Sequence, residues 1–415
     1  MKLKNLTHDA KKFIELQVFF TGLTAILSLF VNTFLLNSFG SYSREVLLYN
    51  VILAVVQPLA MVTSVFAAKA KNALLTQRIG LTFYSLALVV LCIFGERISF
   101  LYPLFAVMLS FGAGYYWTTY SCQMFCYTMD GNRDLIAGIT GFFASAVSIL
   151  LPFSSGILIG KFGKVTGYRI VFGIAAALSV GAYLTNRHLP KLPQISEKPS
   201  FSYVIKTILR SPNGRRIMAA NALCDCRGGT LPIFVTLLFY NLMPDEMMIS
   251  LNGAIGNLVA VLGAAMYGAF IISRNRVRAS IAASVAVMLP AIGMLFGQNI
   301  AIIMIFNAVN GFFGTFISTP VLNTHFRVME DLDFNGEYGP EIHTFREVFV
   351  ALGRVAGLAI VWAVPKTNIG AVIVVLFLSL TALLDTLLLR SIERDMKKQK
   401  SGSSEKKEKH DHTKK

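Results

Sequence analysis

Charged residues are scarce in this sequence. Asp, Glu, Lys and Arg make up 14% of the 415 residues, whereas 54% are hydrophobic. A soluble globular protein of this size needs a polar surface and cannot hide so much apolar area, so the composition excludes that class. Hydrophobic runs of about 20 residues, the length that spans a bilayer, recur along nearly the whole chain. We expect a polytopic membrane protein.

Cysteine is also scarce, and the five cysteines do not indicate a disulfide framework. All of them fall inside apolar runs, where a structural disulfide is not expected. Cys224 and Cys226 are two residues apart, so on a helix they point about 200° away from each other and bind one metal ion poorly. We expect no metal site and no cofactor.

Signatures of an enzyme are absent from the sequence as well. There is no glycine-rich phosphate loop followed by Lys and Ser or Thr, so we do not expect the chain to hydrolyse nucleotide. No paired carboxylates or metal-ligand cluster supports a membrane enzyme. We therefore expect that the protein is not an enzyme.

Twelve apolar segments are long enough to be transmembrane helices. They lie near residues 13–37, 46–68, 79–95, 99–127, 135–159, 168–186, 216–242, 248–272, 279–297, 300–325, 344–364 and 369–391. Most Lys and Arg residues fall on the side of the two termini, which predicts that both termini are cytoplasmic. The net charge of +16 arises in these loops and ends. We interpret it as attraction to the headgroups of the lipid bilayer, not to nucleic acid.

The chain divides into two groups of six segments. We expect an N-terminal bundle over residues 1–187 and a C-terminal bundle over 215–392, joined by a proline-containing cytoplasmic linker over 188–214. Within the linker, Phe201–Arg210 has apolar residues on one helical face and is predicted to lie in the membrane interface. Residues 393–415 are rich in Lys, Ser and Glu, and we expect a disordered basic tail.

Short matches between the halves indicate an internal repeat. A shift of 204 positions aligns Lys11-Lys12 with Arg215-Arg216, Phe30-Val31 with Phe234-Val235, and Asn37 with Asn241. A shift of 213 positions aligns Arg133-Asp134 with Arg346-Glu347, and Pro152 with Pro365. Each match is short, but together they support a duplicated six-helix unit. Parallel repeats of this kind are typical of one large transporter class.

The chain resembles the major facilitator superfamily. The resemblance rests on six plus six segments, cytoplasmic termini, a long central linker, the repeat, and Arg133 with Gly138 five residues later. The loop after the second segment, from Ala68 to Gly80, lacks the aspartate of the family signature. The resemblance implies an all-α membrane protein of two pseudo-symmetric six-helix bundles that moves a small-molecule substrate. We expect a multi-pass protein of the cytoplasmic membrane, acting as a monomer.

Three charges interrupt the apolar segments near their middle: Asp225, Arg227 and Arg354. None of them aligns with a charged residue in the other half, and charge at such depth is usually kept for function. At 1.5 Å per residue, Asp225 and Arg354 lie about 14 and 15 Å from the starts of their segments, so we predict that they pair. Asp225 and Arg227 point about 200° apart on a straight helix. Pro232 and Gly229 predict a break in the helix beside them.

These three residues are our main candidates for function. Their charges sum to +1 when all are ionised. The excess favours an anionic or polar solute held by Arg227 or Arg354. Asp225 is the candidate for proton coupling. The alternative is a structural ion pair that holds the C-terminal half together.

Charges at the predicted cytoplasmic helix ends form a second group. Arg133-Asp134 and Arg346-Glu347 occupy corresponding positions in the two halves. Symmetric charges at helix ends favour an architectural or gating role, and we expect a cytoplasmic latch. Candidate partners in that latch are Lys69, Lys71 and Arg78 facing Glu330, Asp331, Asp333, Glu337 and Glu341, and Arg274, Arg276 and Arg278 facing Asp130 and Asp134.

Polar and aromatic residues of two other segments are weaker candidates. Because the fourth and tenth segments line the cavity in the family fold, the fourth offers candidates for an aromatic wall, with ordinary packing or lipid contact as the alternative. These candidates are Tyr115, Tyr116, Trp117 and Tyr120, of which Tyr116 and Tyr120 are favoured. Asn307 and Asn310 share a helix face and offer hydrogen bonds to a solute, although such pairs also join helices.

The sequence thus predicts a secondary active transporter, by symport or antiport, that works by alternating access. A pump that exports amphipathic compounds and a lipid flippase are alternatives on the same fold. A non-transporting membrane sensor or scaffold is an alternative of another class.

Overall fold

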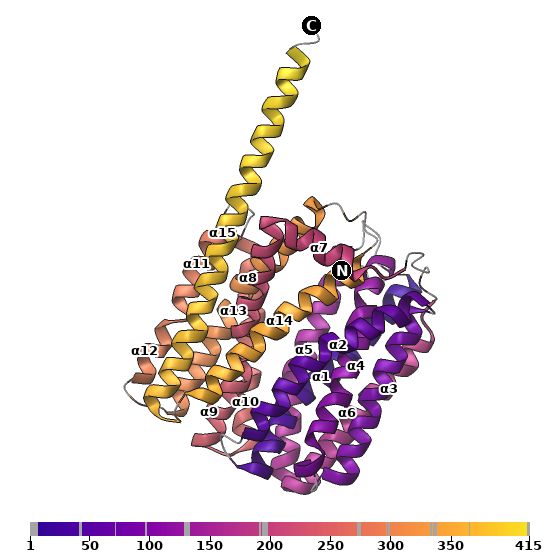
Figure 1. The fold of residues 1–415 in the computed structure, drawn as a ribbon. Coiled ribbons are helices and arrows are strands. Elements are labelled where there is room, and N and C mark those ends of the chain that lie inside the picture. Colours follow the sequence, from indigo (N-terminus) through magenta and orange to yellow (C-terminus); the bar gives the residue numbers. More distant parts are fainter. Residues whose placement is uncertain are drawn as a thin grey trace.

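The computed structural model describes residues 7–40, 44–70, 72–95, 98–127, 133–190, 192, 198–271, 275–295, 297, 299–332, 334, 338–364 and 366–412. Within these residues all regular structure is helical. The helices form two bundles that lie side by side (Figure 1). The first bundle consists of α1 (His8–Phe39), α2 (Arg44–Ala70), α3 (Ala73–Phe94), α4 (Ile98–Tyr127), α5 (Arg133–Phe162) and α6 (Lys164–Arg187).

The second bundle also crosses the membrane six times, but two of its crossings are interrupted helices. The seventh crossing of the chain is split into α8 and α9, and the ninth into α11 and α12. The elements are α8 (Pro212–Gly228), α9 (Leu231–Leu242), α10 (Glu246–Phe270), α11 (Arg276–Ala286), α12 (Leu289–Leu295), α13 (Ile300–Asp331), α14 (Gly339–Ala363) and α15 (Asn368–His412). The predicted all-α fold of two six-helix bundles is confirmed.

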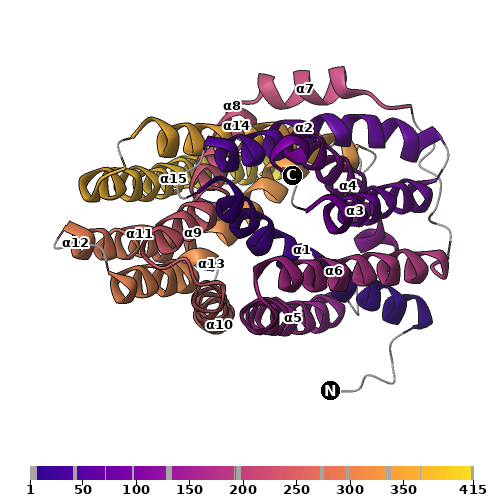
Figure 2. The same ribbon diagram turned by 90° about the horizontal axis from the view of Figure 1, so that it is seen from below.

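Both ends of the described chain lie at one end of the molecule, where α1 begins and α15 leaves the bundle (Figure 1). We call this the inner end and the opposite one the outer end. Figure 2 looks along the helices from the outer end, and the two bundles lie beside each other around the middle of the molecule.

The outward faces of the bundles are apolar. Among the described residues, nine helices are long and apolar enough to cross a membrane. Large apolar side chains such as Phe100, Phe142 and Ile369 are exposed on the surface of the isolated chain. In water such a surface would be unfavourable, whereas in lipid it costs little, so the chain is a multi-pass membrane protein.

Side chains at the helix starts satisfy backbone groups that the helices leave open. Asp245 accepts hydrogen bonds from the amides of Met247 and Met248 at the start of α10, and Asn72 accepts one from Leu74 at the start of α3. Each helix begins with amides that have no partner inside it, and these caps supply one. The capping residues therefore determine where the crossings start.

Small residues bring α8 and α14 into close contact. A Cβ atom at Gly353 would overlap the carbonyl of Ala222, and one at Gly357 would lie 2.5 Å from the carbonyl oxygen of Cys226. Helices in lipid associate through such close packing because burial of apolar area gives little driving force there. This contact places Arg354, between the two glycines, beside α8.

The linker contains one helix, α7 (Phe201–Arg210), over the residues predicted to form an amphipathic helix. Val204 and Ile208 are fully buried and belong to an apolar cluster with Ile217 and Met218 of α8. The polar face of α7 remains outside, as its sequence pattern predicts. The linker is therefore packed onto the inner end of the second bundle.

Helix α15 is longer than expected. We predicted disorder from residue 393, but the helix continues to His412 and extends beyond the other helices (Figure 1). Ile392 is fully buried, and the next turn is held by ion pairs of Glu393 with Arg276 and of Asp395 with Arg216. These contacts, with Met396 packed against the same apolar cluster as Ile392, hold this part of α15 against the second bundle.

Candidate solute-binding cavity

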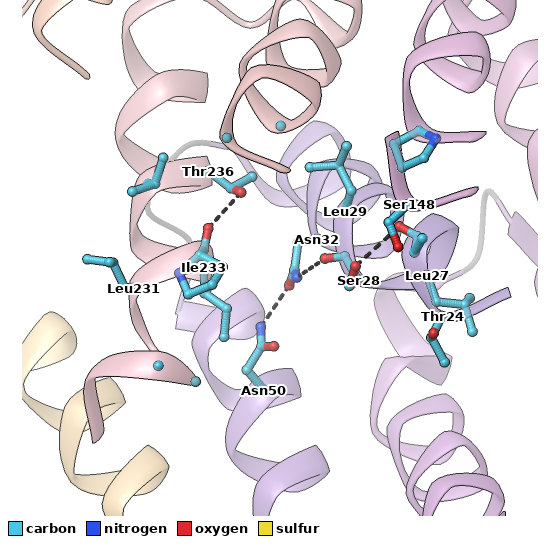
Figure 3. A pocket seen from close by; sticks show the side chains of 18 of the residues that line it. Thr24, Leu27, Ser28, Leu29, Asn32, Asn50, Ser148, Leu231, Ile233 and Thr236 are labelled. Carbon is cyan, nitrogen blue, oxygen red and sulfur yellow. Dashed lines mark hydrogen bonds between the residues drawn. The ribbon is translucent and has the colours of Figure 1, made fainter. Parts of the chain in front are cut away.

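A cavity of about 840 Å³ lies between the two bundles. Its wall comes from α1, α2, α3, α4 and α5 on one side and from α8, α9, α10, α13 and α14 on the other. Figure 3 shows part of it, with Asn32 and Ser28 of α1, Asn50 of α2 and Thr236 of α9. A central cavity shared by two repeats is where transporters of this architecture bind their solutes.

Side-chain amides and hydroxyls supply most of the polar groups in the wall. The lining carboxamides are Asn32, Asn50, Gln57, Asn252, Asn257, Asn307 and Asn310. Asn50 donates to Oδ1 of Asn32 at 2.7 Å (Figure 3). Asn307 donates to the carbonyl of Asn252 at 2.9 Å. An amide both donates and accepts, so this wall suits a solute rich in hydrogen-bonding groups.

Four of these carboxamides belong to the second bundle. Two of the four, Asn307 and Asn310, were candidates from the sequence, and both line the cavity. Asn252 and Asn257, together with Asn32 and Asn50 in the first bundle, were not. Their sequence positions carry no spacing signal, because a lone Asn in an apolar helix serves packing as often as binding.

The only charged side chains among the described lining residues are Arg227 and Arg354, and both belong to the second bundle. Arg227 is 6% exposed. Asp225 is not part of the lining. A solute in the cavity therefore faces two guanidinium groups, and the carboxylates that balance them lie behind the wall.

Asp225 and Arg354 form the ion pair predicted from their equal depth. Nε and Nη2 of Arg354 each lie 2.9 Å from Oδ2 of Asp225. Both side chains are about a quarter exposed. A Cβ atom at Gly229 would lie 2.7 Å from Oδ2 of Asp225 and would also collide with Arg354. The pair therefore requires glycine at position 229.

The predicted break in the helix lies beside this pair. Helix α8 ends at Gly228 and α9 begins at Leu231. Pro232 has no amide hydrogen, so it cannot bond the carbonyl of Gly228 in the helical pattern. The hydroxyl of Thr230 reaches the carbonyl of Arg354 at 3.4 Å and links the break to α14. Gly228, Gly229 and Leu231 all line the cavity.

Arg227 points away from the Asp225 pair, as the helical geometry predicted. Its Nη2 donates to Oδ1 of Asn310 on α13. Among the described residues, its Nε has no hydrogen-bond partner. This atom is fully buried, so its missing partner is a cost of the packing around Arg227 and not a donor that faces the cavity.

Asp385 is a buried carboxylate that the sequence analysis overlooked, although it stands inside the predicted segment 369–391. It is completely buried in α15, accepts from the Thr386 hydroxyl at 3.0 Å, and interacts electrostatically with Arg227. The Arg216–Asp395 pair aligns the antiparallel α8 and α15. Counted from it, Arg227 and Asp385 lie about 16 and 15 Å into the bundle, at the same depth.

This carboxylate adds a fourth ionisable group to the site. The four charges sum to zero when all are ionised, and the sum stays at +1 when Asp385 carries its proton. The positive character belongs to the cavity wall, which contains the arginines. The sequence could not show this, because Asp385 reaches Arg227 only through the packing of α15 on α8.

The predicted aromatic wall is wrong for the two tyrosines. Tyr116 is completely buried and stacks on Phe20 of α1 with ring centroids 3.3 Å apart. Tyr120 packs against Phe13 and Trp117 instead of lining the cavity. Trp117, between them in sequence, does line it. Neighbouring helical residues point about 100° apart, so a small error in helix rotation selects the wrong ring.

The inner end carries part of the predicted latch. Lys69 of α2 pairs with Glu341 of α14, and both side chains are buried. Gln57 of α2 donates to Glu347 at 3.2 Å, so Glu347 also bridges the bundles. Arg346 instead donates to Asn221 of α8, inside its own bundle.

The other predicted latch contacts differ or cannot be assigned. Arg78 donates to Asn186 of α6, and Arg276 donates to Glu393 of α15. Arg133 and Asp134 begin α5, but their side chains lie outside the described residues, as do Lys71, Asp130, Arg274, Asp333 and Glu337.

The outer end has a polar link that the sequence did not predict. Asn37 of α1 donates to Glu246 of α10 at 2.7 Å and accepts from Tyr240 of α9 at 2.6 Å. Lys164 of α6 donates to Asn37 and lies 3.6 Å from Glu246. The two bundles are thus bridged by polar contacts on both sides of the cavity.

Comparisons with known proteins give little at the level of sequence. No family model matches the chain. A curated protein of Geobacillus stearothermophilus, named "Uncharacterized protein in sodM 3'region", is 28% identical over 149 residues, which are 36% of this chain and 69% of that protein. This likeness assigns no activity.

Solved structures match almost the whole chain. A bacterial homologue of the iron transporter ferroportin, in an inward-facing state, has a TM-score of 0.70 and 12% identity, covering 94% of this chain and 99% of its own. The nucleoside transporter NupG has a TM-score of 0.69 and 11% identity, and the match covers 93% of this chain and 99% of that chain. The POT family transporter PepTSo has a TM-score of 0.70 and 12% identity, and the match covers 93% of this chain and 98% of that chain. The chain therefore has the major facilitator fold that its sequence resembles.

Proposed function

We propose that the protein is a secondary active transporter that moves a small polar or anionic solute across the cytoplasmic membrane by alternating access. The observation that carries this proposal is the pair of guanidinium groups, Arg227 and Arg354, in the wall of a cavity between two six-helix bundles. Intramembrane charge is expensive and is usually retained where a solute or ion passes. The similar solved structures are described as transporters, which supports the same class.

Alternating access requires that each end of the cavity opens in turn. The Lys69–Glu341 pair at the inner end and the Asn37–Glu246 contact at the outer end join opposite bundles. A rocking motion of one bundle against the other would break one link while the other holds. These links are therefore our candidates for the inner and outer gates.

Asp225 is our candidate for coupling transport to protons. It pairs with Arg354, which lines the cavity, so an anionic group on Arg354 would compete with the carboxylate for the guanidinium. A carboxylate that loses its partner in a membrane takes up a proton more readily. We expect Asp225→Asn to abolish proton-driven accumulation while passive exchange of solute remains. Proton-driven accumulation at the normal level in this variant would contradict the coupling role.

The function can be tested without knowing the solute. Purified protein is screened for thermal stabilisation by anionic, neutral and cationic solutes, and the hits are tested for flux in proteoliposomes. We expect a hit to depend on Arg354, so Arg354→Ala should remove the stabilisation. A protein that binds a solute but never carries it across the bilayer would be a sensor or scaffold.

A second variant separates binding from structure at the Asp225–Arg354 pair. Arg354→Ala leaves a carboxylate without its partner and is expected to destabilise the protein. The double variant Asp225→Asn with Arg354→Gln removes both charges and is expected to recover much of the stability. If that double variant also transports normally, the ion pair is structural only.

A further inference from the structure

The two sides of the cavity differ in charge. Both lining arginines belong to the second bundle, while the described lining residues of the first bundle are uncharged. The polar groups of that first side include Thr24, Ser28, Asn32 and Asn50. The second wall therefore offers charge-assisted hydrogen bonds beside four carboxamides, Asn252, Asn257, Asn307 and Asn310, whereas the first offers only neutral amides and hydroxyls.

The charged wall has donors that the protein does not use. Arg227 lines the cavity, and its Nη2 is bonded to Asn310, while its Nε is fully buried and does not face the cavity. Arg354 contacts Asp225 through Nε and Nη2, which lie on one edge of its guanidinium. The opposite edge is not engaged by Asp225. Guanidinium groups with open edges bind the oxygens of carboxylates and phosphates.

The two arginines line the cavity, whereas the carboxylates that interact with them are not among the lining residues. Asp225 pairs with Arg354 and Asp385 interacts with Arg227, yet neither acid lines the cavity. An anion in the cavity would meet the arginines first and would not face a carboxylate in the wall. A cation would meet two positive groups, and its approach would be repelled.

The neutral wall suits hydroxyl groups. Asn50 and Asn32 are joined to each other, and Asn32 also donates to the carbonyl of Ser28, which orients both amides (Figure 3). Oriented amides recognise hydroxyls because each can donate to or accept from them. The cavity of about 840 Å³ lies within the range of about 300–1,000 Å³ that holds small molecules.

Resting on the proposed function, we infer that the solute is a hydroxylated organic anion that binds in one orientation. Its oxyanion lies against Arg227 and Arg354 in the second bundle, and its hydroxyl groups lie against the amide wall of the first. The oxyanion is a carboxylate, as in a sugar acid, or a phosphate, as in a sugar phosphate. Both offer several oxygens to the same donors.

The test separates charge from hydroxyl groups with four probes. Gluconate has a carboxylate and hydroxyls, glucose 6-phosphate has a phosphate and hydroxyls, hexanoate has only the carboxylate, and sorbitol has only hydroxyls. Thermal stabilisation of the purified full chain gives each apparent Kd. We expect gluconate or glucose 6-phosphate to bind at least tenfold more tightly than hexanoate and sorbitol. The tighter of the two identifies the oxyanion, and it should exchange in proteoliposomes.

Variants test the orientation. Arg227→Gln is expected to weaken the preferred probe at least tenfold, while Arg227→Lys, which keeps the charge, should retain part of the binding. Asn32→Leu should weaken the preferred probe but leave hexanoate unchanged. Arg216→Gln is the matched control, because Arg216 lies on the same helix at the inner end and pairs with Asp395. Unfolding temperatures without solute show which variants are folded.

The outcomes distinguish this inference from the proposed function. Equal binding of sorbitol or hexanoate, or no loss with a folded Arg227→Gln, would overturn the inference. Transport of a neutral or cationic solute, with none of the four probes bound, would overturn it and leave the transporter proposal intact. If no solute of any class crosses the bilayer, the proposed function itself fails.

Discussion

The two halves of this molecule share a scaffold but differ in the chemistry that they present to the cavity. Asn50 lies six residues after the start of α2, and Asn252 lies six residues after the start of α10. These helices are the second crossings of the two halves, and both residues line the cavity. By contrast, the repeat aligns Asp225 with Thr21 and Arg354 with Gly141. The shared positions contribute polar groups to the cavity, and our proposal assigns its solute preference to the unshared charges.

The same contrast distinguishes the contacts that join the halves. At the inner end the Lys69–Glu341 pair is buried, with side chains 3% and 0% exposed. At the outer end Lys164 is 55% exposed, and the bridge depends mainly on the neutral Asn37. The inner link therefore depends on charge in a dry environment, and the outer link on hydrogen bonds near the surface.

The largest effect is expected for Lys69→Met, because it leaves Glu341 buried without its partner. Breaking a buried ion pair in this way costs about 3–5 kcal/mol. Lys164→Met removes an exposed partner of Glu246 and should cost about 0–1 kcal/mol. Unfolding temperatures of the two variants in the same detergent measure the difference. Equal losses would show that the two links do not differ as described.

A smaller effect is expected for Gly229→Ala in the charged wall. The new methyl group would collide with Arg354 and Asp225, and overpacking of this kind costs about 1–3 kcal/mol. Gly228→Ala is the matched control, since a Cβ atom there meets only Oδ1 of Asp225 at 3.9 Å. We expect the control to be neutral and Gly229→Ala to weaken solute binding as well. The reverse order would argue against the observed geometry of the pair.

The smallest effect is expected for Asn50→Leu in the neutral wall. It removes the 2.7 Å hydrogen bond to Asn32, and a bond of this type contributes about 0.5–1.5 kcal/mol. Asn252→Leu, at the corresponding position of the second bundle, removes the acceptor side chain near Asn307 and should have a similar effect. Thermal unfolding of both variants tests whether these positions are equivalent. A loss of stability at only one of the two positions would show that they are not equivalent.

Much of the architecture was predictable because it follows from local desolvation. Apolar runs of membrane length indicate crossings wherever they occur, and counting residues along a helix predicted the Asp225–Arg354 pair. The ninth and eleventh crossings were also predicted, but the division of the ninth into α11 and α12 was not.

The parts that could not be predicted depend on how helices are rotated and which distant helices meet. Trp117 lines the cavity while its neighbour Tyr116 stacks on Phe20, and only the packing of α4 on α1 decides between them. The Asn37–Glu246 contact joins residues 209 positions apart. No local pattern marks either residue as part of a gate.

The sequence by itself thus determined the membrane, the helical architecture, and the depth of three unusual charges, because each depends on the cost of placing local groups in lipid. The tertiary structure alone decided which of those charges line the cavity and which lie behind it. It also brought Asp385 to Arg227 and placed neutral amides opposite the arginines. Those relations arise only where separate helices pack, because there each side chain's direction and neighbours are set.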